Sequence, residues 1–316
     1  MQQNRLHFPM TRPNRCSMND SLAFLNGRWV THHDTHLSLD DWGVLQGVIL
    51  VERLRTYGGK IFQLPRHIER LKDSVTAIGL NWDRWCNFNL VETCERVAAS
   101  AIETLGQDED VGLVILATPG AVHTNEPTRI VHASELPWKK LAHWYESGQD
   151  LITASVRNVP SQCWPVHIKT RSRLHYFLAD QQASQVGAYA GALMLDIDGN
   201  VTETSFANVM MINRDMELLA PVREKVLPGI SLELALSLAQ QLDISTRFTN
   251  ISQDDLRDAK EILLTGTNGG IWHAKSIDGR ALDVPGPDSV LSRLQNGWQQ
   301  MVGLDFKKQA QRFINT

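Results

Sequence analysis

The chain has 316 residues, of which 42% are hydrophobic and 21% charged, and its formal net charge is −4 at pH 7. This length predicts two domains that each bury a core, and the small negative charge gives no basic surface for nucleic acid or an anionic membrane. No apolar run reaches the length of a membrane span and the first residues do not resemble a secretion signal, so we expect a cytoplasmic protein.

The N-terminal part of the chain offers few candidates for a functional site. Residues 1–18 are polar and lack periodicity, which predicts a loose tail. Residues 21–30 predict two short strands that turn at Asn26-Gly27. Three histidines follow between residues 32 and 36, but no cysteine accompanies them and no helix signal places them on one face. We therefore expect no metal site.

A hairpin is predicted over residues 48–64, with its turn at Gly58-Gly59. Alternation along the first strand places Arg53 and Arg55 on one face and Glu52 on the other. Either arginine is a candidate for binding a substrate carboxylate, since the guanidinium group pairs well with carboxylates. An ordinary solvated strand face explains the pattern equally well.

Two helices and a strand complete the first half of the chain. Pro65 stands in a favoured early helix position, and the apolar stripe that follows is flanked by Arg70. A second helix is predicted over residues 89–105 and an apolar strand over residues 111–117. The composition changes at Leu136-Pro137-Trp138, where we place the domain boundary.

Lys169 is the first candidate for catalysis in the second half. It follows residues 165–168, which read as a short extended stretch, and precedes a helix with an apolar stripe of Leu174, Phe177 and Leu178. A lysine at a junction of strand and helix is partly buried, which lowers its pKa and makes the amine a nucleophile. An exposed surface lysine is the alternative, because most lysines are exposed.

A carboxylate and a helix start follow Lys169. Glu203 comes just after the turn dipeptide Asp198-Gly199, where an exposed acid would also be ordinary. Residues 227–231, with the sequence L-P-G-I-S, then open a strongly apolar helix. Free N–H groups at such a start bind anions, although Ser231 is also a good helix cap.

The C-terminal part contains one more candidate anion site. Residues 261–267 predict a strand that ends in a glycine-rich turn containing Thr267 and Asn268. Hydroxyl and N–H groups in such a turn can hold a phosphate, while a plain turn is the alternative. A last helix is predicted over residues 289–302.

Taken together, these motifs resemble the class IV (fold type IV) aminotransferase family, which includes branched-chain aminotransferases, D-amino-acid aminotransferases and aminodeoxychorismate lyases. The resemblance rests on H-I-E-R-L around Arg70, the segment of Lys169, T-E-T-S-F-A-N-V with Glu203, and L-P-G-I-S. It implies an α/β (α+β) fold with a small α/β domain over residues 19–137. A larger barrel-like α/β domain would cover residues 138–316, usually within a homodimer.

The resemblance also implies pyridoxal phosphate as cofactor. Lys169 would hold it as a Schiff base and act as general base, and Glu203 would face its ring nitrogen. The residues expected to hold its phosphate are Arg70, Gly229, Ile230, Ser231, Thr267 and Asn268. Arg53, Arg55 and Arg173 are weaker candidates for the substrate carboxylate, the substrates being an amino acid and a keto acid.

The chain departs from the family pattern at several positions. Trp42 stands where the family has arginine, residues 47–49 replace Gly-Asp-Gly, and Val51 replaces the aromatic residue that lines the substrate pocket. Pro119 replaces an arginine of the lyase and D-amino-acid branch, whereas Leu174 replaces the tyrosine of branched-chain enzymes. Transamination of a branched-chain-like or D-amino acid is therefore the main expectation. A lyase of the aminodeoxychorismate type and a catalytically silent relative remain alternatives.

Overall fold

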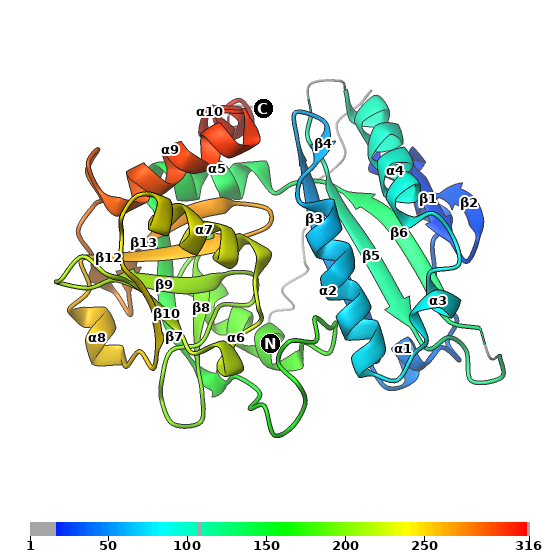
Figure 1. The fold of residues 1–316 in the computed structure, drawn as a ribbon, viewed down its shortest axis with the longest axis horizontal. Helices are drawn as coiled ribbons and strands as arrows, with labels where there is room; N and C mark the ends of the chain where they lie inside the picture. The colour runs from blue at the N-terminus through cyan, green and yellow to red at the C-terminus, as the bar shows by residue number, and fades with distance from the viewer. Residues whose placement is uncertain (1–16, 107–108, 125, 315–316) are drawn as a thin grey trace, which may run out of the picture.

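The computed structural model describes residues 17–106, 109–124 and 126–314 of the chain. Most of the expected tail, residues 1–16, lies outside this part. The described chain forms two sheets with helices packed against each (Figure 1), which confirms the predicted α/β class. The sheets are divided between residues 134 and 149, and we propose residues 19–137 and 138–316 as the two domains.

The smaller sheet has six strands in the order β2-β1-β6-β5-β3-β4, all antiparallel. Its strands are β1 Leu22–Leu25, β2 Arg28–Thr31, β3 Leu50–Tyr57, β4 Lys60–Ile61, β5 Gly112–Thr118 and β6 Thr128–Ser134. Its helices are η1 Met18–Asp20, η2 His32–Asp34, α1 Trp42–Leu45, α2 Leu64–Ala77, α3 Trp82–Trp85 and α4 Leu90–Leu105. Both predicted hairpins, the two longer helices and the apolar strand are confirmed.

The two faces of the smaller sheet have different neighbours. Helices α2 and α4 cover one face (Figure 1), where Leu54 of β3 packs with Leu71 and Trp85 in a buried core. The alternate residues of β3 face the larger domain, and Tyr57 belongs to the core of that domain. Strand β3 therefore contributes side chains to both domains, as its period of two requires.

The larger sheet follows the order β11-β10-β9-β12-β13-β7-β8, and β14 pairs with β13. Its strands are β7 Gln149–Arg157, β8 Gly191–Leu195, β9 Asn208–Ile212, β10 Leu218–Pro221, β11 Thr246–Thr249, β12 Glu261–Gly266, β13 Gly270–Ile277 and β14 Arg280–Ala281. The helical segments are α5 Trp138–Ser147, α6 Leu174–Ser184, η3 Arg223–Lys225, α7 Ile230–Gln241, α8 Gln253–Arg257, α9 Val290–Val302 and α10 Phe306–Gln311.

A short segment, residues 201–204, closes part of the larger sheet into a ring. On one side, Met194 N of β8 donates to Glu203 O at 2.9 Å, and Thr202 N donates to Met194 O at 3.0 Å. On the other side, Glu203 forms a bridge with Asn208 of β9. The segment thus joins β8 to β9, which lies two strands from β13 along the same sheet. Glu203 sits on the strip that makes this domain barrel-like.

The apolar stripe predicted for the helix after Lys169 does not face the core. Leu174 is 71% exposed and Phe177 60% exposed, whereas Ala179 and Ala183 are buried. These alanines pack on β7 and β8, because their small side chains let α6 lie close to the strands. The helix occurs as predicted, and the face that it buries is the one with the alanines, not the apolar stripe.

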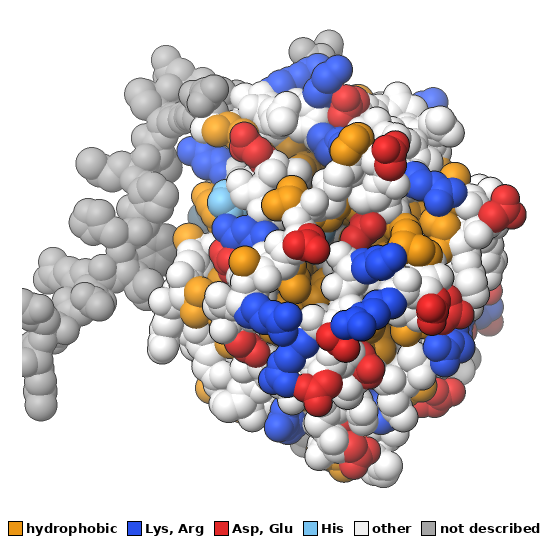
Figure 2. Space-filling model, turned by 90° about the vertical axis from the view of Figure 1, so that its left-hand side faces the viewer, with side chains coloured by type: hydrophobic (Ala, Val, Ile, Leu, Met, Phe, Trp, Pro, Cys, Tyr) orange, Lys and Arg blue, Asp and Glu red, His pale blue; other side chains and the backbone are white. Residues whose placement is uncertain are grey.

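The side of the larger domain that faces away from the smaller one carries both signs of charge. Figure 2 shows Lys and Arg side chains interspersed with Asp and Glu over this face, without an extended field of one sign. Exposed ion pairs of the larger domain include Arg214–Asp258 at 3.1 Å. In the described residues, no helix is both long and apolar enough to cross a membrane.

Candidate active site

Lys169 is held where the segment after β7 meets the smaller sheet. Val51 N donates to Lys169 O at 2.9 Å, and Arg171 N donates to Ile49 O at 2.8 Å. The preceding residues 165–168 form a turn, not the extended stretch we predicted. The lysine therefore does not lie at the end of a strand of its own domain. Its backbone is fixed by the start of β3, which belongs to the other domain.

The surroundings of Lys169 favour its uncharged amine. Burial and, after it, the nearby cation Arg70 together lower the pKa of the lysine to about 7, against the opposing effect of Glu52. A pKa of this size leaves a large fraction of the amine unprotonated at neutral pH. Lys169 thus has the property that a nucleophilic or basic lysine needs.

Glu203 is buried and fully hydrogen-bonded. Tyr176 Oη donates to its Oε1 at 2.6 Å, while Asn208 Nδ2 and Leu227 N donate to its Oε2 at 3.1 and 3.3 Å. Burial raises the pKa of Glu203 although these hydrogen bonds and Lys169 favour the anion. A buried acid of this kind is poised to pair with a cationic group in the adjoining cavity.

Two of these partners of Glu203 were not among the predicted site residues. Asn208 lies in the F-A-N-V run that follows the acid, and Tyr176 lies on α6, seven positions after Lys169. The position of Tyr176 in the first turn of the helix that follows Lys169 is a signal that the sequence contains. Its use requires knowing which face of α6 turns toward Glu203.

The start of α7 forms the next wall of the site. Gly229 occupies the position before the helix, and no side chain caps the first turn. Leading N–H groups without a cap attract anions. A Cβ at Gly229 would lie 2.0 Å from Asn208 Oδ1, so the wall is shaped by the lack of a side chain here.

The variant Gly229→Ala is expected to weaken binding of a phosphate-bearing cofactor by about tenfold or more. Asn208 would have to move, and the hydrogen bond that it donates to the carboxylate of Glu203 is of a kind worth about 1.5–3 kcal/mol. The measurement is a cofactor titration of the cofactor-free protein. Gly187→Ala is the matched control, since nothing lies within 4 Å of a Cβ there. Equal affinities in the two variants would contradict the role of Gly229.

Arg70 is anchored by a buried acid of β3. Its Nε and Nη2 donate to the two oxygens of Glu52, each at 2.8 Å, and its Nη1 donates to Pro228 O at 2.9 Å. His67 Nδ1 lies 2.7 Å from the same carboxylate. Burial opposes ionisation of Glu52, but Arg70 and His67 outweigh it and lower its pKa to about 2. Arg70 therefore holds a fixed position beside the residue that precedes Gly229.

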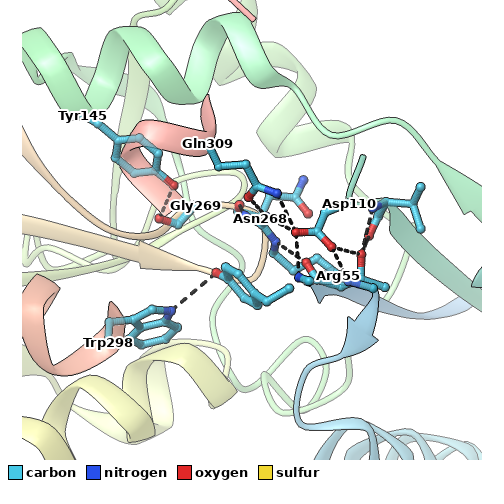
Figure 3. A network of polar contacts seen from close by, with 12 residues as sticks. Arg55, Asp110, Tyr145, Asn268, Gly269, Trp298 and Gln309 are labelled. Atoms are coloured by element: carbon cyan, nitrogen blue, oxygen red, sulfur yellow. Dashed lines mark hydrogen bonds and ion pairs between the residues drawn. The ribbon is translucent and has the colours of Figure 1, made fainter. Parts of the chain in front are cut away.

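Asn268 is positioned from the smaller domain by Arg55 (Figure 3). Its Nη1 donates to Asn268 O at 2.6 Å, and its Nη2 lies 3.9 Å from Asp110 Oδ2. Gln309 of α10 donates to the same Asp110 oxygen at 2.7 Å. Arg55 is only 1% exposed and therefore does not reach a substrate, contrary to our prediction that it could bind the substrate carboxylate. It positions the turn instead of lining a cavity.

The variant Arg55→Met should lower the free energy of unfolding by about 2–4 kcal/mol, because it removes a buried cation from Asp110 and a donor from Asn268 O. Urea unfolding followed by circular dichroism would measure this change. Arg214→Met is the control, because the pair of Arg214 with Asp258 is exposed and contributes about 0–1 kcal/mol. A loss no larger than that of the control would rule out the positioning role.

Apart from Arg55, the predicted site residues line two adjoining cavities of about 100 and 260 Å³. We call the first the lysine pocket, which is lined by Arg70, Lys169, Glu203, Gly229–Ser231 and Thr267. We call the second the arginine pocket, which is lined by Arg53, Lys140, Lys169, Arg171, Arg173 and Asn268. Lys169, Arg173 and Thr267 belong to both. Among the described residues, no group of His, Cys, Asp or Glu side chains is arranged to hold a metal ion.

The donor set of the lysine pocket fits pyridoxal phosphate. An amine of low pKa and a buried carboxylate line the same cavity, and an uncapped helix start lies in its wall. The pocket thus offers a covalent anchor, an anionic partner for a ring nitrogen and donors for a phosphate.

The chain is similar to known aminotransferases in sequence and in fold. The chain is 29% identical to branched-chain-amino-acid aminotransferase-like protein 2 of Arabidopsis thaliana, over 89% of this chain and 50% of the relative. It is 25% identical to D-alanine aminotransferase of Bacillus licheniformis, over 89% and 96% of the two chains. The structure of the branched-chain aminotransferase from the archaeon Thermoproteus uzoniensis with norvaline matches with a TM-score of 0.77 at 23% identity, covering 91% and 96%.

The family model of class IV amino-transferases matches residues 49–277, which is most of the chain. This range includes β3, the lysine segment, the strip with Glu203 and the start of α7. The chain belongs to the class IV aminotransferase family.

Proposed function

We propose that this aminotransferase uses pyridoxal phosphate, held in the lysine pocket, to move an amino group between an amino acid and a 2-keto acid. The observation that carries the proposal is the meeting of Lys169 and Glu203 in one cavity with the uncapped start of α7. These groups come from segments that are separated in the sequence by up to about 60 residues. They supply the amine, acid and anion site that the cofactor requires.

Different residues of the pocket would bind different parts of the cofactor. Lys169 Nζ would bind its aldehyde carbon, and Glu203 would face the ring nitrogen with Tyr176 and Asn208 holding its two oxygens. The N–H groups of Ile230 and Ser231, together with Arg70 and Thr267, would hold the phosphate. Asn268 lies one residue further and lines the arginine pocket, so we assign it to the support of this turn.

When bound, pyridoxal phosphate supplies an aldehyde that condenses with amines and a ring that withdraws electrons from the substrate α-carbon. Lys169 Nζ, once free, takes the proton from that α-carbon, which its low pKa permits at neutral pH. Glu203 keeps a negative charge opposite the ring, in a site where burial makes each interaction stronger. Tyr176 fixes the orientation of this carboxylate through its 2.6 Å hydrogen bond.

The test is uptake of pyridoxal phosphate by cofactor-free protein, followed by a panel of amino donors with 2-keto acids. We expect a visible absorption band on uptake and amino transfer that requires an acceptor. The uptake rate should rise from about pH 6 to about pH 8 and then level off, because the pKa of Lys169 is about 7. Product release without an acceptor would indicate the lyase reaction instead. A chain that takes up no cofactor would refute the proposal.

We also propose that the chain acts as a homodimer. The support is the exposed apolar surface of α6, formed by Leu174, Phe177 and Leu178 at 71, 60 and 44% exposure. Apolar side chains grouped on one helix favour contact with another protein surface. Analytical ultracentrifugation tests the proposal, and a monomer at all micromolar concentrations would refute it.

A further inference from the structure

The arginine pocket adjoins the lysine pocket and shares Lys169 with it, so a substrate that reacts at Lys169 can extend into it. Its apolar part consists of Val51 from β3 and of Trp144, Phe206 and Trp272, whose rings stack with one another. Val51 occupies the position at which the resemblance to the family predicts an aromatic residue of the substrate pocket. The side chain that fills this position is smaller than an aromatic ring, and charged residues line the space beside it.

The lining of the arginine pocket is strongly cationic. Besides Lys169 it contains Arg53, Lys140, Arg171 and Arg173, and none of the described residues that line it is Asp or Glu. With these four cations charged, the walls carry a charge of about +4. Cations cluster in this way where an anion balances them, since like charges at close range repel one another.

Two of the arginines have no balancing partner within the described chain. The guanidinium groups of Arg53 and Arg171 form no ion pair or hydrogen bond among the residues the structure describes. Burial and the neighbouring arginines lower the pKa of both. Arg53 is partly buried and Arg171 is exposed at the edge of the pocket, and a bound oxyanion would give both guanidinium groups the acceptor that the described residues do not supply.

Contacts with neighbouring residues hold the other two cations, Arg173 and Lys140, in place. Arg173 donates to Ser205 O and lies 4.3 Å from the ring centre of Tyr176. Lys140 lies 4.8 Å from the ring centre of Trp144. Asp180 attracts Lys140 and Arg173, but burial raises the pKa of this acid. Glu203 attracts Arg173 as well. The charges that act on Arg53 and Arg171 come from other arginines, so these two acids do not balance them.

The sheet behind Arg53 adds no negative charge. Arg53 is paired with Val114 of β5, and Val114 is paired with His132 of β6. Burial, and the neighbouring Arg53 and Arg171 after it, lower the pKa of His132 to about 4, so this ring is neutral at pH 7. The floor of the cluster is therefore formed by a neutral histidine and an apolar residue.

We infer that the arginine pocket binds a second oxyanion of the substrate, so that the preferred amino acid has a side chain ending in a carboxylate or a phosphate-type group. The inference rests on the proposed function. The α-carboxylate common to all amino acids balances one guanidinium group, which leaves at least two of the arginines for another anion. An apolar branched side chain would leave these cations desolvated and unpaired, which selects against it.

Arg53 and Arg171 are the residues that determine this specificity. Each extends from a segment that fixes its backbone, Arg53 from β3 and Arg171 from the residues bonded to Ile49. Two planar guanidinium groups that line one cavity can together bind one oxyanion with two or more donors.

The experiment measures binding of unreactive acids to the cofactor-loaded protein by isothermal titration calorimetry. Glutarate and 3-phosphonopropionate are compared with 4-methylpentanoate, which has one carboxylate and an apolar branch. We expect the dianions to bind at least about tenfold more tightly, the tighter of the two indicating which oxyanion the site prefers. Arg53→Gln and Arg171→Gln should each weaken dianion binding about tenfold and change 4-methylpentanoate binding less than about twofold.

Control variants make the result decisive. Arg53→Lys keeps the charge and should retain part of the preference, while Arg214→Gln, an exposed arginine remote from the pocket, should match the unmodified protein. Equal binding of dianions and 4-methylpentanoate would overturn the inference. So would dissociation of a dimer in Arg53→Gln and Arg171→Gln without a change in dianion affinity, because the arginines would then pair with a second chain.

Different results would refute the proposed function and the assignment of the substrate class. Protein that takes up no cofactor refutes the proposed function. Protein that takes up the cofactor and transfers amino groups, but shows no dependence of dianion binding on Arg53, refutes only the assignment of the substrate class.

Discussion

Replacing Lys169 by alanine is expected to lower the rate of amino transfer by at least about 1,000-fold, since a positioned general base alone contributes about 10²–10⁴-fold. The variant should also lose the visible absorption band, because no other lysine amine lies at the same place in the lysine pocket. Both effects follow from one atom, Lys169 Nζ, whose surroundings lower its pKa to about 7. Stopped-flow mixing with an active donor and acceptor measures the rate, and a cofactor titration measures the band.

The matched control is Lys72→Ala, which removes an exposed lysine from α2. It should leave both the band and the rate unchanged. Retention of the band in Lys169→Ala would show that the cofactor is bound elsewhere, and retention of the rate would show that another group moves the proton. In either case the assignment of Lys169 would be wrong.

The variant Glu52→Ala should lower the free energy of unfolding by about 3–5 kcal/mol, the cost of leaving buried charges without their partner. Glu52 is fully buried and accepts two hydrogen bonds from Arg70, which in turn holds Pro228 O. Its removal leaves Arg70 and His67 without their acceptor inside the protein. Urea denaturation measures the loss, and cofactor affinity should fall with it, because Arg70 is no longer fixed beside Gly229.

Glu69→Ala provides the comparison, because Glu69 is exposed on the same helix and its loss should cost no more than about 0.5 kcal/mol. The pH dependence gives a second check. The pKa of Glu52 is about 2 in the folded chain and 4.5 without its partners, so its contribution is present above about pH 4.5. It should be lost as the pH falls from 4.5 toward 2. A loss below 1 kcal/mol in Glu52→Ala would contradict the account.

Local patterns were sufficient for much of the fold. The turn at Asn26-Gly27 and the helix from Leu90 to Leu105 depend on neighbouring residues, and both occur as predicted. The alternation of β3 was likewise readable, and it placed Glu52 and Arg53 on opposite faces. What alternation cannot supply is the partner of each face, which depends on segments distant in the sequence.

The site was predictable in its residue types but not in its contacts. Lys169 was expected beside a strand of its own domain, yet the residues that fix its backbone are Ile49 and Val51, more than 100 positions earlier. Arg55 had the chemistry of a substrate ligand, but Asp110 and the C-terminal helix take up its guanidinium group. Such pairings between distant segments are settled by tertiary packing, and no single stretch of sequence encodes them.

The position of Glu203 on the strip between β8 and β9 has a consequence for heat inactivation. If residues 201–204 detached from β8 and β9, Glu203 would leave the lysine pocket and the core of the larger domain would become exposed to water in the same event. Gradual loosening of the acid with the rest of the domain intact is therefore disfavoured. Catalysis and tertiary structure should be lost together on heating, within one cooperative transition.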